Sequence, residues 1–277
     1  ATDNCYHVVF TDSSNTTAML NGFTLTRGYA AGHAWHTFGG GVRAWGGGVI
    51  LVNVILIDNY ASHTGGGAYA VVGGVINAYN CSFIDNRAPA GNGGGYWGEI
   101  GRAPEPLTLV NCVFRGNSAG RGGGIHLEYA NLEPVLVNLT ISGNSADNGG
   151  GGIHLLSTGA ITFDNCIIWG NSSWVHPQFY GDIPSTTMNH SIFEGGWTGP
   201  GTGNLDSDPS FRDAEFQLDL DSPAIDAGDS TALPLDLADL DEDHVTDELI
   251  ELAVDRDRRR VDDPYVPDTG VPDGNGR

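Results

Sequence analysis

The sequence predicts an all-β chain in which a parallel β-helix, or β-solenoid, is followed by an irregular acidic C-terminal segment. Two markers recur in step and carry this prediction. The first is a strand led by Asn or Gly, whose copies are GFTLTRGYA (22–30), NVILIDNYA (53–61), NCSFIDNRA (80–88), NCVFRGNSA (111–119), NLTISGNSA (138–146) and NCIIWGNSS (165–173). The second is a glycine triplet, found at 39–41, 65–67, 93–95, 122–124 and 150–152. Two independent markers with one period of about 27 residues indicate stacked repeats.

Each repeat favours strands over helices. Short period-2 runs of β-branched and aromatic residues are bounded by Gly and Asn, and no repeat contains a stretch with helical periodicity. A unit of this length accommodates three short strands and three turns, which make one circuit of a triangular coil. Because a single coil cannot bury its apolar side alone, neighbouring coils are expected to stack at the strand spacing of about 4.8 Å.

Side-chain alternation along the Asn-led strand predicts its buried face. The inward positions are uniformly apolar and form two columns, Val54, Cys81, Cys112, Leu139 and Cys166, then Leu56, Phe83, Phe114, Ile141 and Ile168. In such a column cysteine acts as a small hydrophobe, so we expect unpaired thiols. A disulfide between Cys81 and Cys112 on adjacent coils is geometrically conceivable but not required.

Asparagine and glycine mark the corners of the coil. Two asparagine columns, at 53, 80, 111, 138 and 165 and at 59, 86, 117, 144 and 171, are expected to form amide ladders at the turns. The glycine triplets supply positive φ and close backbone approach at a second corner. Residues 1–21 are then an opening partial coil, 22–171 the regular coils, 172–229 degenerate closing coils, and 230–277 an acidic tail.

Charge and hydropathy limit the partners. The net charge is −22, and all twelve basic residues are arginine. Such a surface repels phosphate backbones, which argues against a nucleic-acid partner, and it suits a saline or calcium-rich exterior. No apolar run approaches the roughly 18 residues that cross a bilayer. The opening ATDNCYHVVF lacks the layout of a signal peptide, so we expect a mature product or a chain whose beginning is missing.

The repeats resemble those of a known group of proteins. The alternation of Phe-x-x-Asn (83–86, 114–117) with Gly-Gly-Gly-Ile (122–125, 150–153) is similar to polymorphic outer-membrane-protein repeats, and more broadly to the pectin-lyase-like superfamily of bacterial secreted proteins. GFTLTRG (22–28) resembles the first coil of such proteins and SPAIDAGD (222–229) their C-terminal end. The resemblance implies a right-handed single-stranded β-helix at the cell surface or outside the cell. It does not specify activity, because the superfamily includes lyases, hydrolases, adhesins and passive fibres.

One outward row is the candidate ligand-binding surface. If the coils are in register, the residues that follow the glycine triplets form one exposed column, consisting of Arg43, Tyr69, Trp97, His126 and His154. Aromatic and imidazole rings in such a row can stack against sugar faces or pack against another protein. The alternative is an ordinary solvent-facing strand surface.

Catalytic candidates are few. Glu99 and Glu128 are expected on adjacent coils, near the roughly 5 Å carboxylate separation of retaining glycosidases, with His126 beside them. The enzymatic relatives use clustered Asp residues, with a basic residue in pectate lyases, and no such set can be matched here. The sequence therefore leans away from an enzyme, with a polysaccharide lyase or glycoside hydrolase acting along the outward row as the alternative.

Two further surfaces suggest a metal and a partner. The tail alternates oxygen ligands as a calcium loop does, with candidate ligands Asp239, Asp241, Asp243, Asp247 and Glu251. It is no standard EF-hand, and a solvated acidic turn is the alternative. The outward side of the Asn-led strand carries an apolar stripe, consisting of Ile55, Ile57, Ile84, Val113, Ile167 and Trp169, which could be covered by the C-terminal segment or by a second copy. The sequence thus predicts a secreted or surface-attached structural, adhesive or fibre-forming protein that binds itself or a surface glycan.

Overall fold

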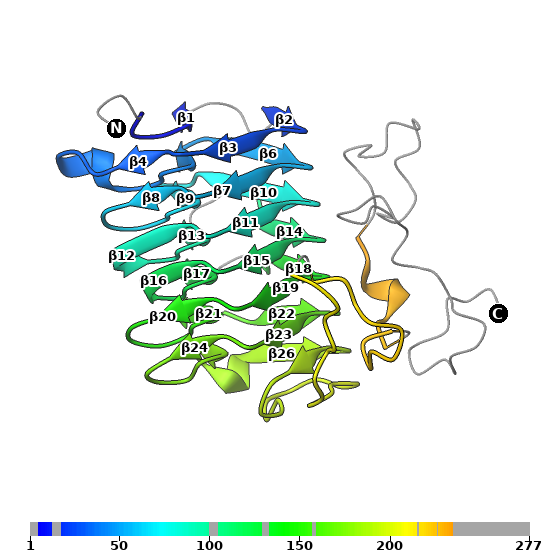
Figure 1. The fold of residues 1–277 in the computed structure, drawn as a ribbon. Coiled ribbons are helices and arrows are strands. Elements are labelled where there is room, and N and C mark those ends of the chain that lie inside the picture. Colours follow the sequence, from blue (N-terminus) through cyan, green and yellow to red (C-terminus); the bar gives the residue numbers. More distant parts are fainter. Residues whose placement is uncertain are drawn as a thin grey trace, which may run out of the picture.

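The chain forms an all-β right-handed parallel β-helix of about six turns (Figure 1). The computed structural model describes residues 5–12, 18–99, 105–128, 133–156, 159–214, 216–225 and 227–234. All of its strand pairs within the four sheets are parallel, and each strand lies between the equivalent strands of the coils before and after it. The predicted fold class and repeat length are confirmed.

Four sheets run along the axis. Sheet A contains β1 (Val9–Asp12), β5 (Val42–Trp45), β9 (Ala68–Val71), β13 (Tyr96–Glu99), β17 (Ile125–Glu128), β21 (Ile153–Leu156) and β25 (Phe179–Tyr180). Sheet B contains β2 (Met19–Asn21), β6 (Gly48–Val52), β10 (Val75–Tyr79), β14 (Thr108–Val110), β18 (Val135–Val137), β22 (Ile161–Asp164) and β26 (Thr186–Asn189).

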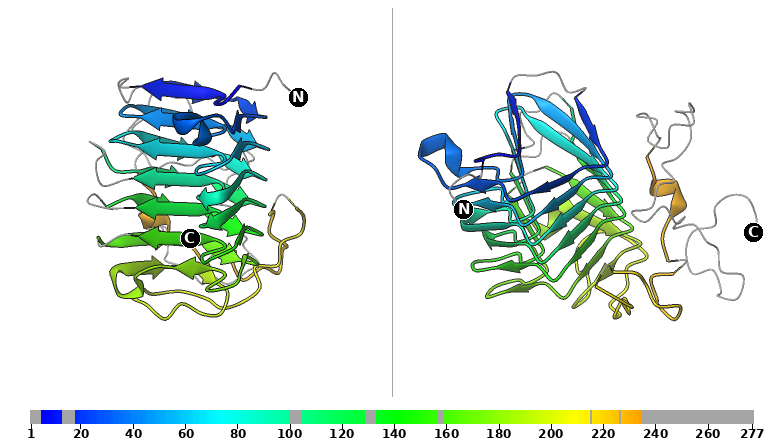
Figure 2. Two further views of the ribbon diagram at one scale, coloured as in Figure 1. Left: turned by 90° about the vertical axis from the view of Figure 1, so that its left-hand side faces the viewer. Right: turned by 45° about the horizontal axis from the view of Figure 1, so that its top comes forward.

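Sheet C is built from the Asn-led strands β3 (Thr24–Thr26), β7 (Ile55–Ile57), β11 (Ser82–Ile84), β15 (Val113–Arg115), β19 (Thr140–Ser142), β23 (Ile167–Trp169) and β27 (Ile192–Phe193). Sheet D contains the short strands β4 (Tyr29–Ala30), β8 (Tyr60–Ala61), β12 (Arg87–Asn92), β16 (Ser118–Arg121), β20 (Ser145–Ala146) and β24 (Ser172–Ser173). A regular coil therefore has four strands, where the sequence predicted three (Figure 2).

Helical structure in the described chain is limited to three short 3₁₀ turns, η1 (Ala34–Thr37), η2 (Ile183–Ser185) and η3 (Ser230–Ala232). Only η1 interrupts the regular coils, in the first circuit, where it stands away from the stack (Figure 2). Across the described residues, no helix has the length and apolar character needed to cross a bilayer.

The core runs down the axis as columns of like residues. Both predicted inward columns of sheet C are fully buried, and Phe83 stacks on Phe114 with ring centroids 4.5 Å apart. The three column cysteines are free thiols; the Sγ of Cys81 donates to the carbonyl of Tyr79, and that of Cys112 to the carbonyl of Val110. Burial raises the pKa of the Cys81 thiol, which keeps it protonated and hydrophobic in character.

Of the two predicted amide ladders, the one that begins at Asn59 is continuous and closes the corner between sheets C and D; the one that begins at Asn53 is interrupted, because the Oδ1 of Asn80 has no hydrogen-bond partner. Each Nδ2 donates to the Oδ1 of the next coil at 2.9 to 3.0 Å, in the order Asn59, Asn86, Asn117, Asn144 and Asn171. The backbone N–H of Gly28 occupies the first end of the ladder and the side chain of Gln178 the last. Because every member is satisfied, the ladder fixes the stacking of the coils.

The glycine triplets form the corner between sheets D and A. A Cβ on Gly94 would lie 2.5 Å from the carbonyl oxygen of Gly123 and 2.6 Å from the backbone nitrogen of Ser118. Only glycine permits this approach of successive coils.

Candidate functional site

The outward residues of sheet A form one column, as the sequence predicted. The strand register pairs Arg43 with Tyr69, Tyr69 with Trp97, Trp97 with His126, and His126 with His154. The structure extends this column in both directions, because Phe10 pairs with Arg43 and Tyr180 pairs with His154. We call the seven residues the sheet A row; they are Phe10, Arg43, Tyr69, Trp97, His126, His154 and Tyr180.

The predicted exposure of this row is wrong. The five predicted members, Arg43, Tyr69, Trp97, His126 and His154, are all buried, and His126 has 0% of its surface exposed. The rings cover one another, with centroid distances of 4.7 Å for Tyr69–Trp97, 4.6 Å for His126–His154 and 4.9 Å for His154–Tyr180. The backbone of the glycine corner packs closely against the side chains of the row. A Cβ on Gly93, for example, would lie 2.7 Å from the Cβ of Trp97. The row is therefore packed structure along most of its length.

Burial sets the protonation of the row. It lowers the pKa of His154 to about 3, helped by His126 and Arg121, and it lowers the pKa of His126 despite the favourable contact with Glu128. Burial likewise raises the pKa of Tyr69 to about 12. Both imidazoles are therefore neutral near pH 7. The Nδ1 atoms of both histidines are buried and have no hydrogen-bond partner.

The three catalytic candidates lie together. Glu99 and Glu128 are in register on β13 and β17, and the Nε2 of His126 lies 2.9 Å from a carboxylate oxygen of Glu128. A carboxylate oxygen of Glu99 accepts the backbone N–H of Val72 at 3.2 Å. The His126 ring is enclosed between Trp97 and His154, so in this arrangement a polymeric substrate would reach Glu128 but not the imidazole.

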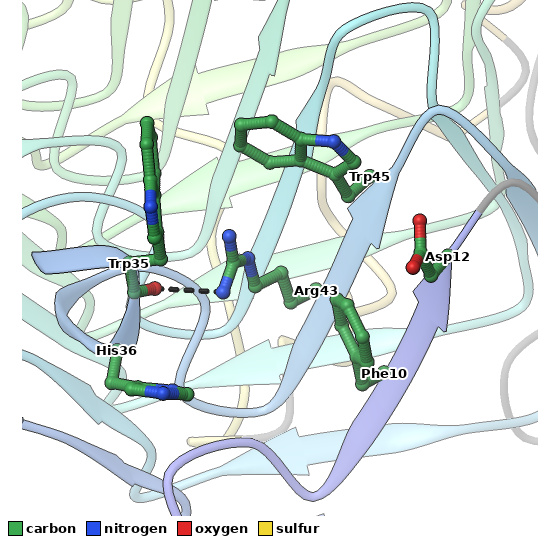
Figure 3. A pocket seen from close by; sticks show the side chains of 6 residues that line it. All are labelled: Phe10, Asp12, Trp35, His36, Arg43 and Trp45. Carbon is green, nitrogen blue, oxygen red and sulfur yellow. Dashed lines mark hydrogen bonds between the residues drawn. The ribbon is translucent and has the colours of Figure 1, made fainter.

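The row opens at its first end into a cleft of about 330 Å³ (Figure 3). Its lining combines three aromatic rings, a guanidinium, a carboxylate and an imidazole, supplied by Phe10, Asp12, Trp35, His36, Arg43 and Trp45. We call this the aromatic cleft. Strand β1 supplies Phe10 and Asp12, β5 supplies Arg43 and Trp45, and the η1 turn supplies the other two. Trp35 is 61% exposed, and its ring meets that of Trp45 edge-on, with centroids 5.1 Å apart.

Arg43 is held at the base of this cleft, with its guanidinium toward the space between Trp35 and Trp45 (Figure 3). One terminal nitrogen donates to the carbonyl oxygen of Trp35 at 2.7 Å and lies 3.4 Å from the Nε2 of His7. The guanidinium carbon lies 5.4 Å from the centroid of Phe10 and 5.3 Å from that of Trp45, within cation–π range. Its Nε has no hydrogen-bond partner. Burial lowers the pKa of Arg43, an effect that the charge of Asp12 opposes.

Sequence reasoning named Arg43 as a ligand residue, and alternation along the strand placed Trp45 on the same outward face, but the other four residues of the cleft were missed. A signal for Trp35 and His36 was present, because Gly22 and Gly39 are 17 positions apart, whereas the equivalent Asn53 and Gly65 are 12 apart. The extra residues contain the segment AWHT that forms η1. Phe10 and Asp12 precede the first recognisable repeat, so the period could not align them.

The apolar stripe of sheet C is covered in part by the chain itself. Arg115 donates to the carbonyl oxygen of Ala214, and the side chain of Asn165 exchanges hydrogen bonds with the backbone of Asp229, so the C-terminal segment contacts this side of the coils at these two residues. Val113 is buried, whereas Ile55, nearer the other end, is 40% exposed. Ile57, Ile84, Ile167 and Trp169 are half-buried. Self-association through this stripe stays a prediction.

The predicted calcium ligands lie outside the described residues. Asp239, Asp241, Asp243, Asp247 and Glu251 all belong to the segment from 235 to 277. Within the described ranges, no three His, Cys, Asp or Glu side chains gather in a way that could hold a metal ion. Calcium binding by the tail stays a prediction.

Comparison with known proteins agrees with the geometry. No curated protein and no solved structure matches the chain. The family model described as "Right handed beta helix region" matches residues 2–168, which is more than half of the chain and contains the aromatic cleft, the amide ladder as far as Asn144 and the sheet A row as far as His154. The chain belongs to this right-handed β-helix family.

Proposed function

We propose that the protein is a secreted or cell-surface β-helix that binds glycans without turning them over, through the aromatic cleft on its first two coils. The observation that carries this proposal is the open pair of indole rings, Trp35 and Trp45, set around the Arg43 guanidinium. Aromatic faces stack on the C–H faces of sugar rings, and charged groups beside them bond the hydroxyls. Asp12 and His36 supply such groups at the same cleft.

Composition and repeats support an exterior location and an adhesive or structural role. A net charge of −22 without lysine suits a saline medium and opposes nucleic-acid partners. The likeness of the Phe-x-x-Asn and Gly-Gly-Gly-Ile repeats to those of polymorphic outer-membrane proteins supports export. Continuous ladders and ring stacks make the body a stiff scaffold on which a small recognition site is carried.

The burial of the sheet A row narrows the binding surface. A polysaccharide lying along the whole face would need Tyr69, Trp97, His126 and His154, which are enclosed. Contact is instead concentrated at the first end, where Phe10 and Trp35 are exposed. A footprint of a few sugar units follows, rather than the long groove predicted from the sequence.

Titration calorimetry with neutral gluco-, manno-, galacto- and xylo-oligosaccharides tests this function. At least one of these series should bind, and Trp35→Ala should weaken that binding at least about tenfold by removing one stacking face. Trp174→Ala is the matched control, because Trp174 is 92% exposed and lies outside the cleft. Equal losses in the two variants, or no binding of any neutral or acidic saccharide, would contradict the proposal.

The second candidate function is a carbohydrate-active enzyme, favoured by the contact between His126 and Glu128 and by the in-register Glu99. In that case Glu128, the partly exposed member, would carry the proton transfer. Incubation with neutral and uronate polysaccharides, followed for reducing and unsaturated ends, separates the two functions. Turnover that disappears in Glu128→Gln and persists in Trp174→Ala would favour the enzyme.

A further inference from the structure

Arg43 supplies a positive charge at the base of the aromatic cleft. Arg43 is only 5% exposed, and a buried cation is costly unless acceptors or counter-charges compensate it. The protein does not use the full hydrogen-bonding capacity of this guanidinium, because the contacts to the carbonyl oxygen of Trp35 and to His7 both involve the same terminal nitrogen, Nη1. An acceptor from outside the chain would complete it.

His7 holds the guanidinium in place. Its Nδ1 lies 2.7 Å from the carbonyl oxygen of Gly39, which can only accept, so Nδ1 carries the proton. In the neutral ring, Nε2 is then unprotonated, and its lone pair faces Arg43. It lies 3.4 Å from the terminal nitrogen of the Arg43 guanidinium. Burial lowers the pKa of His7, which maintains this neutral tautomer. Arg43 is thus fixed from two sides before any ligand arrives, as a preorganised site requires.

The rest of the molecule limits how much negative charge a ligand can carry. The net charge is −22, and Arg43 is the one arginine among the residues that line the cleft, where Asp12 is also present. A polyanionic chain would gain one favourable contact and meet repulsion from the rest of the surface. A single anionic group would gain the contact with little of the repulsion.

We infer that the aromatic cleft takes a saccharide with one acidic group, which lies against Arg43 while adjoining neutral rings stack on Trp35 and Trp45. The inference rests on the proposed glycan-binding function and specifies its ligand. The acidic group is a carboxylate or a sulfate ester, since both present the oxygen acceptors that a guanidinium recognises.

Calorimetry with matched probes tests the inference. The probes are neutral tetrasaccharides, the same tetrasaccharides with one terminal sugar oxidised to a uronic acid, the same with one sulfate ester, and tetrasaccharides made only of uronic acid. We expect the singly acidic probes to bind about tenfold more tightly than the neutral ones, and the carboxylate and sulfate arms distinguish the two sources of charge. The fully acidic probe should bind less tightly than the singly acidic one.

Two variants assign the preference to this cleft. Arg43→Gln should bind neutral and acidic probes equally, and Trp35→Ala should weaken both by the same factor. Because Arg43 is buried and its replacement can impair folding, Asp12→Asn is measured as well. Asp12 is an exposed residue of the cleft, and removing its negative charge should increase the preference for the singly acidic probes.

The outcomes separate the two proposals. If neutral and singly acidic probes bind equally in the wild type, the inference is overturned and the glycan-binding function stands. If the fully acidic probe binds best, the limit to one charge is wrong. If no probe of any kind binds, both proposals fail. A preference that survives Arg43→Gln and is unchanged in Asp12→Asn would place the acidic group elsewhere and would also overturn the inference.

Discussion

The first end of the sheet A row differs from its middle, although strands of the same sheet build both parts. From Tyr69 to His154 the side chains stack and are buried, whereas at Phe10 and Arg43 the column opens into a cleft. The backbone register is continuous across both parts. The difference lies in the turn that follows sheet D, which is short in the later coils and contains the η1 insertion in the first. One inserted turn can therefore convert packed structure into a candidate binding site without changing the repeat.

The largest effect expected from this comparison concerns two tryptophans. Replacing Trp97 by Ala should lower the free energy of unfolding by about 3–4 kcal/mol, because its buried ring stacks on Tyr69 and closes the row. Trp35→Ala should cost less than about 1 kcal/mol, because most of its surface is already exposed. Urea denaturation followed by circular dichroism measures both. Similar losses would mean that the enclosed part of the row and the aromatic cleft do not differ in packing.

The next largest effect concerns the amide ladder. It tests whether the ladder contributes to the difference between the open cleft and the enclosed part of the sheet A row. Asn59 lies beside the first coils and Asn144 beside the later ones, yet both are fully buried and bond the next ladder asparagine at 3.0 and 2.9 Å. Each also donates to a core carbonyl, that of Leu25 or Phe114. Asn59→Ala and Asn144→Ala should therefore each cost about 2 kcal/mol, since each leaves buried groups unpaired.

Urea midpoints of these two variants, compared at equal slope, provide the measurement. Equal costs would show that the scaffold is uniform and that the insertion alone opens the cleft. A much smaller cost for Asn59→Ala would show that the first coils are packed more loosely than the later ones. The insertion would then not be the only reason that the cleft is open.

The repeat pattern in the sequence predicted the core but did not predict the cleft. Columns such as Phe83 over Phe114 follow from alternation within a strand and a fixed period between strands, both of which are visible in one sequence. Alternation showed that Trp97 points out of sheet A, but not that its neighbours in the row would cover it. Outward and exposed are different properties when like residues stack at strand spacing.

The cleft residues and the fourth sheet were missed because they depend on features that do not recur with the repeat. Phe10 reaches the cleft because β1 pairs with β5 across an irregular first circuit. Trp35 reaches it because η1 folds back, with its carbonyl oxygen on Arg43. The fourth sheet was missed because strands such as Tyr60–Ala61 are too short to show alternation. Local insertions and short strands are thus the parts of a β-helix that its repeat does not specify.

The smallest expected effect is the dependence of stability on pH in the enclosed part of the row. The pKa of His154 is 6.5 in the unfolded chain and about 3 in the folded protein. As the pH falls below 6.5 the unfolded chain takes up this proton first, so the contribution of His154 is complete above about pH 6.5 and is lost toward pH 3. With allowance for solvent screening, the loss should reach about 1 kcal/mol by pH 5.

This contribution can be isolated by comparing His154→Gln with the wild type in urea at pH 7 and pH 5. The pKa of His126 is also lowered and gives a slope of the same sign, whereas the raised pKa of Asp164 gives the opposite sign, so only the difference between the two proteins is informative. The wild type should lose about 1 kcal/mol more than His154→Gln over this interval. Trp174→Ala, which removes an exposed ring and no titratable group, is the control and should retain the wild-type slope. If His154→Gln retains it too, the imidazole is solvated in solution, and the row is open along its whole length rather than at one end.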